Sequence, residues 1–72
     1  MTMRQPTQAG GGVVKLTPAE AAVVAQVVRG LTNKEIARRL RKAEPTVKSQ
    51  LASVYRKLGL KRRLQLIAMF HR

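Results

Sequence analysis

Two short sequences, Thr17-x-x-Glu20 and Thr32-x-x-Glu35, restrict the fold of this chain more than any other feature. In each, the Thr hydroxyl can accept a hydrogen bond from the Glu backbone N–H, while the Glu carboxylate accepts one from the Thr N–H. This arrangement, the capping box, marks the first turn of an α-helix. Pro18 suits the first helical position, and Gly30 predicts the end of that helix. The chain is therefore expected to form short helices joined by tight turns.

Apolar residues recur at helical spacing after each predicted start. The first helix carries a valine stripe, formed by Val23, Val24, Val27 and Val28. The second helix, about two turns long, presents an apolar face made of Ile36, Ala37 and Leu40. A third helix is expected over residues 44–58, before Gly59, and its apolar stripe consists of Val47, Leu51, Val54 and Leu58. A fourth helix is expected over roughly residues 62–71.

The order of these helices predicts the fold class. A short helix, a tight turn and a longer helix form the helix-turn-helix plan, and no hairpin signal interrupts it. We therefore predict an all-α, four-helix helix-turn-helix domain over residues 15–72, consisting of a trihelical core and a C-terminal dimerisation helix. Residues 1–14 are predicted to be a flexible N-terminal leader, because they are mostly polar and contain a run of three glycines.

The charge of the chain points to a polyanionic partner. Fifteen Lys and Arg residues face three acidic ones, which gives a formal net charge of +12 and a pI of about 11.9 over 72 residues. Residues 34–63 carry eleven of the fifteen cations, so the charge belongs to the predicted helices and not to a tail. This distribution is expected of a DNA-binding domain.

Composition excludes other classes of function. With no Cys, one His and three acidic residues, the chain can assemble neither a catalytic set nor a metal site, so we expect no enzyme and no cofactor. No apolar segment approaches the roughly 20 residues that span a membrane, and the first residues lack the apolar stretch of a signal peptide, so none is expected. The expected location is the cytoplasm, at the nucleoid.

Several ordered motifs resemble the DNA-binding domain of LuxR/GerE-type transcription regulators. They are Leu16-Thr17-Pro18 with Glu20, Asn33-Lys34-Glu35-Ile36-Ala37 with Leu40, Thr46-Val47-Lys48, and Val54-Tyr55-Arg56-Lys57-Leu58-Gly59. The resemblance covers about residues 16–70. It implies a third helix that enters the major groove of DNA and a fourth helix that pairs two subunits. It fits either a stand-alone regulator or the output domain of a larger one, such as a response regulator.

The chain departs from the family pattern in a few places. Lys42 stands where an apolar residue is usual, and Ala43 stands where a Ser usually caps the third helix. Loss of such a cap typically costs about 1 kcal/mol. Gln26 also occupies a commonly apolar position. Ala19, Ala21, Ala22 and Ala25 replace residues of the first helix that are usually charged.

The face of the third helix opposite its apolar stripe supplies the candidate contacts to DNA. Short side chains let a helix enter the groove, and Lys, Ser and Ala can contact guanine, several base edges and the thymine methyl, respectively. The predicted base-reading residues are Lys48, Ser49, Ala52, Gln50 and Ser53. The predicted phosphate contacts are Thr46, Lys34, Arg56, Lys57 and Arg63, together with backbone N–H groups at residues 32–35.

Two further surfaces are predicted. The fourth helix has two apolar stripes, and the one formed by Leu66, Met69 and Phe70 is expected to pair two copies of the chain. The alanine-rich outer face of the first helix is a candidate docking surface for another protein.

Alternative interpretations remain open at this level. They are a sigma-factor region 4 domain, a cationic membrane-active or protein-binding module, a protein-binding co-regulator without its own operator, and a nucleoid protein that binds DNA through charge alone.

Overall fold

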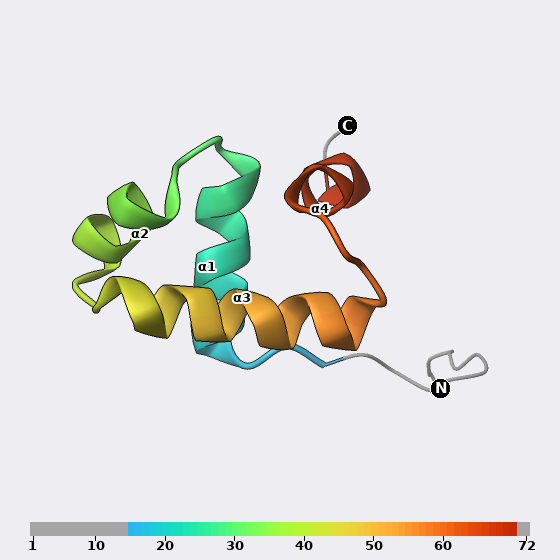
Figure 1. Ribbon diagram of the computed structural model, residues 1–72, viewed down its shortest axis with the longest axis horizontal. Coiled ribbons are helices and arrows are strands. Elements are labelled where there is room, and N and C mark those ends of the chain that lie inside the picture. Colours follow the sequence, from blue (N-terminus) through green and yellow to red (C-terminus); the bar gives the residue numbers. More distant parts are fainter. Residues whose placement is uncertain (1–14, 71–72) are drawn as a thin grey trace, which may run out of the picture.

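The computed structural model describes residues 15–70 and contains four helices (Figure 1). They are α1 (Pro18–Val28), α2 (Asn33–Leu40), α3 (Glu44–Leu58) and α4 (Arg63–Phe70). The predicted all-α fold with a helix-turn-helix is confirmed, and the bounds predicted for the third helix are those observed. The leader predicted over residues 1–14 lies outside the described residues, as does the predicted last residue of the fourth helix, His71.

Both predicted capping boxes form. The Glu20 N–H donates to Thr17 Oγ1 at 3.1 Å, and the Thr17 N–H donates to Glu20 Oε1 at 2.8 Å. The same pair of bonds starts α2, at 3.2 and 2.8 Å between Thr32 and Glu35. Each box satisfies two N–H groups that have no acceptor within the helix. The first turns of α1 and α2 are therefore stabilised by residues local in sequence.

Three residues in the left-handed region end the first three helices. Gly30 (φ 94°) follows α1 and Gly59 (φ 70°) follows α3, as the sequence predicts. The turn after α2 uses Arg41 (φ 57°), which is the only non-glycine residue with positive φ in the part of the chain that the structure describes. A side chain in this conformation is strained relative to glycine. This turn joins the two helices of the helix-turn-helix.

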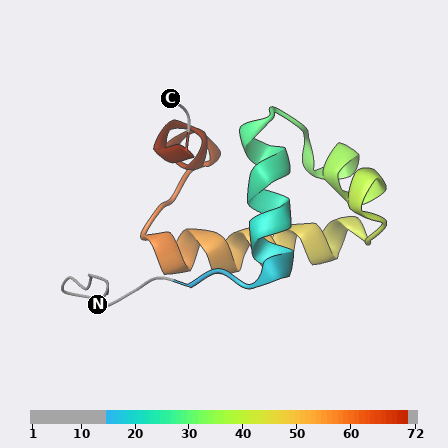
Figure 2. The ribbon, with the colours of Figure 1, turned by 180° about the vertical axis from the view of Figure 1, so that it is seen from behind.

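The apolar side chains buried between the helices are all aliphatic. Figure 1 shows α3 across the molecule, with α2 near its N-terminal end and α4 near its C-terminal end; Figure 2, from behind, shows α1 crossing it. The buried apolar side chains are Val23, Val24, Val27, Ile36, Ala37, Val47, Leu51, Val54 and Leu66. Since α3 packs mainly against α1 and α2, while α4 packs against α1, α3 keeps one long side uncovered by any other helix in residues 15–70.

The position of Leu66 corrects one prediction. Leu66 is 0% exposed and belongs to the core, whereas Leu64, two residues earlier, is 76% exposed. The stripe predicted to pair two subunits therefore loses its first member, because that side chain closes the core against α1. None of the helices in the described residues is long and apolar enough to cross a membrane.

Candidate nucleic-acid interface

The uncovered side of α3 presents short side chains between two long bases. Val47, Leu51 and Val54 are buried on the inner side. The exposed residues of the helix in positions 45–56 are Pro45, Thr46, Lys48, Ser49, Ala52 and Arg56. This set contains three of the five residues predicted to read bases and two of those predicted to contact phosphates. The side is convex, cationic and free of bulky apolar groups, which are properties that suit the major groove of B-DNA.

The N-terminus of α3 lacks a side-chain cap, as Ala43 predicts. Ala43 makes no side-chain hydrogen bond, and Glu44 is the acidic residue of the first turn. The preceding Lys42 is half-buried, and its Nζ donates to Gln50 Oε1 at 3.0 Å. Gln50, predicted to read bases or contact phosphate from the flank of α3, is therefore already engaged by a residue of the turn.

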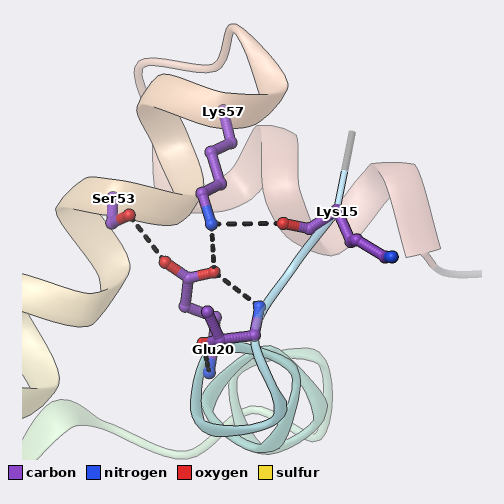
Figure 3. A network of polar contacts seen from close by, with 5 residues as sticks. Lys15, Glu20, Ser53 and Lys57 are labelled. Atoms are coloured by element: carbon purple, nitrogen blue, oxygen red, sulfur yellow. Dashed lines mark hydrogen bonds and ion pairs between the residues drawn. The ribbon is translucent and has the colours of Figure 1, made fainter. Parts of the chain in front are cut away.

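Two predicted DNA contacts face α1 instead. Ser53 Oγ donates to Glu20 Oε2 at 2.6 Å, and Lys57 Nζ lies 2.7 Å from Glu20 Oε1 (Figure 3). Lys57 also donates to the Lys15 carbonyl at 3.1 Å. These bonds place the Ser53 hydroxyl and the Lys57 ammonium in the contact between α3 and α1, although the Lys57 residue as a whole is exposed. The helical spacing placed Ser53 on the side opposite the apolar stripe but could not show a hydrogen-bond partner 33 residues away.

Glu20 is the centre of this contact and carries a charge at ordinary pH. Glu20 is 6% exposed, and its carboxylate accepts hydrogen bonds from Lys57, Ser53 and the Thr17 N–H. The bond from Lys57 contributes most to lowering the Glu20 pKa to about 2, and the bonds from Ser53 and Thr17 act in the same direction. The bonds from Ser53 and Lys57, one turn apart on α3, hold that helix against the first turn of α1.

The N-terminus of α2 offers less to a phosphate than predicted. Of the backbone N–H groups at residues 32–35, those of Thr32 and Glu35 are used by the capping box. The bond from the Thr32 N–H, followed by the Thr32 hydroxyl, lowers the pKa of Glu35, so a carboxylate charge lies at this terminus. Lys34 is exposed beside it. The candidate phosphate contact at this end of α2 is therefore the Lys34 side chain and not the backbone N–H groups.

Arg63, predicted to contact phosphate, holds two parts of the fold together. Its Nη1 donates to Asn33 Oδ1 at 2.7 Å, and its Nη2 donates to the Leu31 carbonyl at 2.6 Å. The guanidinium fork therefore ties the start of α4 to the start of α2. The start of α4 is also capped, because Gln65 Oε1 accepts from the N–H groups of Lys61 and Arg62 at 2.8 and 2.9 Å.

Apolar surface remains exposed on α4 and beside α1. Leu64, Met69 and Phe70 are 76%, 51% and 45% exposed. An open groove of about 500 Å³ runs beside Phe70, and its lining residues are Leu16, Ala21, Val24, Ala25, Val28, Arg29 and Phe70. Two of the alanines predicted to form the outer face of α1, Ala21 and Ala25, thus line this groove. Arg29 supplies its one charged side chain.

Sequence reasoning missed three polar contacts that position the helices: Lys42 with Gln50, Glu20 with Ser53 and Lys57, and Arg63 with Asn33. The scarcity of acid was a usable signal for the second contact. With three acidic residues among fifteen bases, each carboxylate is expected to attract a cation, and Glu20 alone is placed in the packed first helix. No comparable signal exists for the other two.

Comparison with known proteins agrees with this architecture. The sequence profile of bacterial regulatory proteins of the luxR family matches residues 14–70, which include all four helices. Over 52 residues the chain is 52% identical to three proteins whose names describe candidate HTH-type transcriptional regulators, one from Mycobacterium bovis and two from strains of Mycobacterium tuberculosis. The match covers 72% of this chain but 6% of each relative.

The family match is consistent with the fold and assigns the domain to regulation, not to an enzymatic reaction. It extends from the segment before α1 to the end of α4, so it includes the exposed side of α3 and the apolar residues of α4. The resemblance inferred from the short motifs is confirmed over nearly the same residues. The chain belongs to the luxR family of bacterial regulatory proteins.

Proposed function

We propose that this domain binds specific sites on double-stranded DNA and thereby regulates transcription, with the exposed side of α3 in the major groove. The observation that carries the proposal is the set of exposed residues Lys48, Ser49 and Ala52 on the uncovered side of the longest helix. Lys48 reaches guanine O6 or N7, Ser49 bonds donors or acceptors, and Ala52 contacts a thymine methyl. Ser53 is not included, since its hydroxyl bonds Glu20.

The proposed phosphate contacts are Lys34, Thr46 and Arg56. All three are exposed, and Thr46 and Arg56 lie near opposite ends of the proposed reading face. Such contacts orient a domain on the duplex and make its affinity fall with salt, but they do not discriminate between sequences. Lys57 and Arg63 are left out, because their charged groups are hydrogen-bonded within the fold.

We further propose that two copies pair through α4. Met69 and Phe70 remain from the predicted stripe, and Leu64 joins them as an exposed apolar residue. A two-fold pair would present its two α3 helices to successive major grooves, about 34 Å apart, so the binding site would be an inverted repeat. Replacing Phe70 by Glu is expected to weaken both dimer formation and DNA affinity. Unchanged mass and unchanged affinity of that variant would contradict the pairing.

Selection of bound fragments from random duplex DNA tests the main proposal. At about physiological salt, where binding through charge alone is weakened, the expected result is an enriched inverted repeat. Lys48→Ala should lose the enrichment at one or two positions of each half-site, whereas Lys61→Ala removes an equal charge outside the reading face and should keep it. Binding without any enrichment would favour a nucleoid protein that acts through charge.

The groove between α1 and α4 favours a second binding partner, a protein. Its lining is apolar apart from Arg29, and the short Ala21 and Ala25 side chains allow a helix to approach closely. Exposed apolar surface of this kind often marks an interaction site. Ala25→Glu should abolish capture of such a partner without changing DNA affinity. If this variant captures the same proteins as the unaltered chain, the groove is not a docking site.

A further inference from the structure

Lys42 and Gln50 form an interhelix pair beside the proposed reading face. Lys42 lies in the turn between α2 and α3, Gln50 lies in the second turn of α3, and the Nζ–Oε1 distance is 3.0 Å. Both residues are half-buried. Side-chain order at this point is expected to exceed that of an exposed Lys or Gln, because the contact restrains two long side chains at once.

The chemistry of the pair fixes the orientation of the amide. A Lys ammonium has three donors and no acceptor, so the atom of Gln50 that faces it must be the oxygen. The Gln50 NH2 group therefore points away from Lys42, and the ammonium retains two further donors. The pair as a unit offers several donors and a positive charge, whereas a free Gln offers a donor and an acceptor side by side.

The position of Gln50 on α3 brings this unit to the edge of the proposed interface. Residues four apart lie on the same side of a helix, so Gln50 follows one turn after the exposed Thr46. It also adjoins the exposed Ser49 in sequence. A donor group at this edge can reach either the adjacent phosphates or the edge of a base at the border of the reading face.

We propose that Lys42 and Gln50 act as one donor unit that binds an acceptor oxygen or nitrogen of the DNA, and that Lys42 disfavours the reading of adenine by Gln50. This inference rests on the proposed function. Reading adenine requires Gln to donate to N7 and accept from N6 at the same time. In the pair, the ammonium occupies one of the two lone pairs of that oxygen and places a positive charge beside the second, so an acceptor on guanine or phosphate is favoured over the adenine amino donor.

Affinity measurements on four proteins test the unit: the unaltered chain, Lys42→Met, Gln50→Leu and the double variant, each on a panel of duplexes altered one base pair at a time. Each single variant should lose about tenfold in affinity, the size of one good base or phosphate contact. The double variant should lose about the same tenfold, because both side chains serve one contact. Lys61→Met is the control for loss of one Lys charge outside the pair.

Two patterns of loss identify the acceptor. A loss confined to duplexes with G·C at one position of each half-site assigns a guanine edge. An equal loss on every duplex, with the slope of log affinity against log salt reduced by about 1, assigns a phosphate. Gln50→Glu keeps a partner for Lys42 but removes the outward donor and adds a negative charge, so it should bind DNA no more tightly than Gln50→Leu while remaining folded.

Three results would overturn the proposal. They are wild-type affinity in both single variants, losses that multiply to about a hundredfold in the double variant, and selection of adenine at the position that Gln50 controls. If Lys61→Met loses as much DNA affinity as Lys42→Met, the loss is explained by net charge, and the proposal fails in that case as well. If the unaltered chain enriches no sequence, the proposed reading function fails, but the phosphate pattern of the pair is still measured on any fixed duplex.

Discussion

Replacing Leu66 by Ala separates a core role from an interface role for α4. The side chain is fully buried in the cluster that joins α1, α3 and α4, so truncation leaves a cavity in addition to the lost burial. Buried Leu→Ala changes cost about 2–5 kcal/mol. A domain of this size rarely has more than about 3–5 kcal/mol of total stability, so most of the folding free energy should be lost.

Thermal and urea unfolding followed by circular dichroism at 222 nm measures this loss. At about 4–8 °C per kcal/mol for a small domain, a loss of about 3 kcal/mol lowers Tm by roughly 12–24 °C. The matched variant is Met69→Ala, in the same helix but 51% exposed, which should change monomer stability little. If Leu66→Ala unfolds like the unaltered chain in dilute solution, or if only its dimerisation changes, the placement of Leu66 in the core is wrong.

Three other changes test the polar contacts and the helix ends. Because the pKa of Glu20 is lowered from 4.5 to about 2, the contribution of its carboxylate to stability is complete above pH 4.5 and lost as the pH falls toward 2. In urea titrations, Glu20→Gln should remove most of this fall of the unfolding free energy with decreasing pH. Arg41→Gly should raise stability by about 0.5–1 kcal/mol by relieving a left-handed residue, whereas Arg39→Gly, inside α2, should lower it by about 1 kcal/mol. Ala43→Ser should supply the missing cap of α3 and add about 1 kcal/mol to the stability, with Ala52→Ser as the neutral control. An unchanged unfolding midpoint in Arg41→Gly would contradict the left-handed end of α2, and an unchanged midpoint in Ala43→Ser would contradict the uncapped start of α3.

The fold was predictable because its helix signals are local. The two capping boxes and the glycines at 30 and 59 depend on residues within one turn of each helix end, and the structure contains them as expected. The end of α2 was less visible, since Arg41 adopts a left-handed conformation without being Gly or Asn. Nothing in its neighbours distinguishes it, so the left-handed turn between α2 and α3 could not be assigned to Arg41 from the sequence.

The orientation of α4 could not be derived from its sequence. Apolar side chains project from nearly all sides of this eight-residue helix, so their periodicity does not select an inner face. They are Leu64, Leu66, Ile67, Met69 and Phe70. In the structure Leu66 faces the core, and the bonds of Arg63 to Asn33 and Leu31 restrain the start of the same helix. This is a tertiary constraint, and it explains why the predicted interface stripe contained one core residue.

The candidate DNA-binding side of α3 was predictable in outline but not at its edges. The buried stripe places Lys48, Ser49 and Ala52 on the exposed side, and the structure agrees with that orientation. At the borders a helical wheel assigns residues by angle alone. Ser53 was predicted on the exposed side, but the contacts of Ser53 and Lys57 are decided by Glu20, more than 30 residues away in the chain.

Backbone amide NMR of the labelled domain, titrated with a duplex at about physiological salt, tests the central claim most directly. Binding through the exposed side of α3 predicts the largest shifts at Thr46, Lys48, Ser49 and Ala52, smaller ones near Lys34, and little change in the α1 amides of the groove. Loss of the shifts in Lys48→Ala would support the assignment further. Shifts concentrated in α1 or α4, or spread evenly over all cationic residues, would show that α3 does not read the DNA.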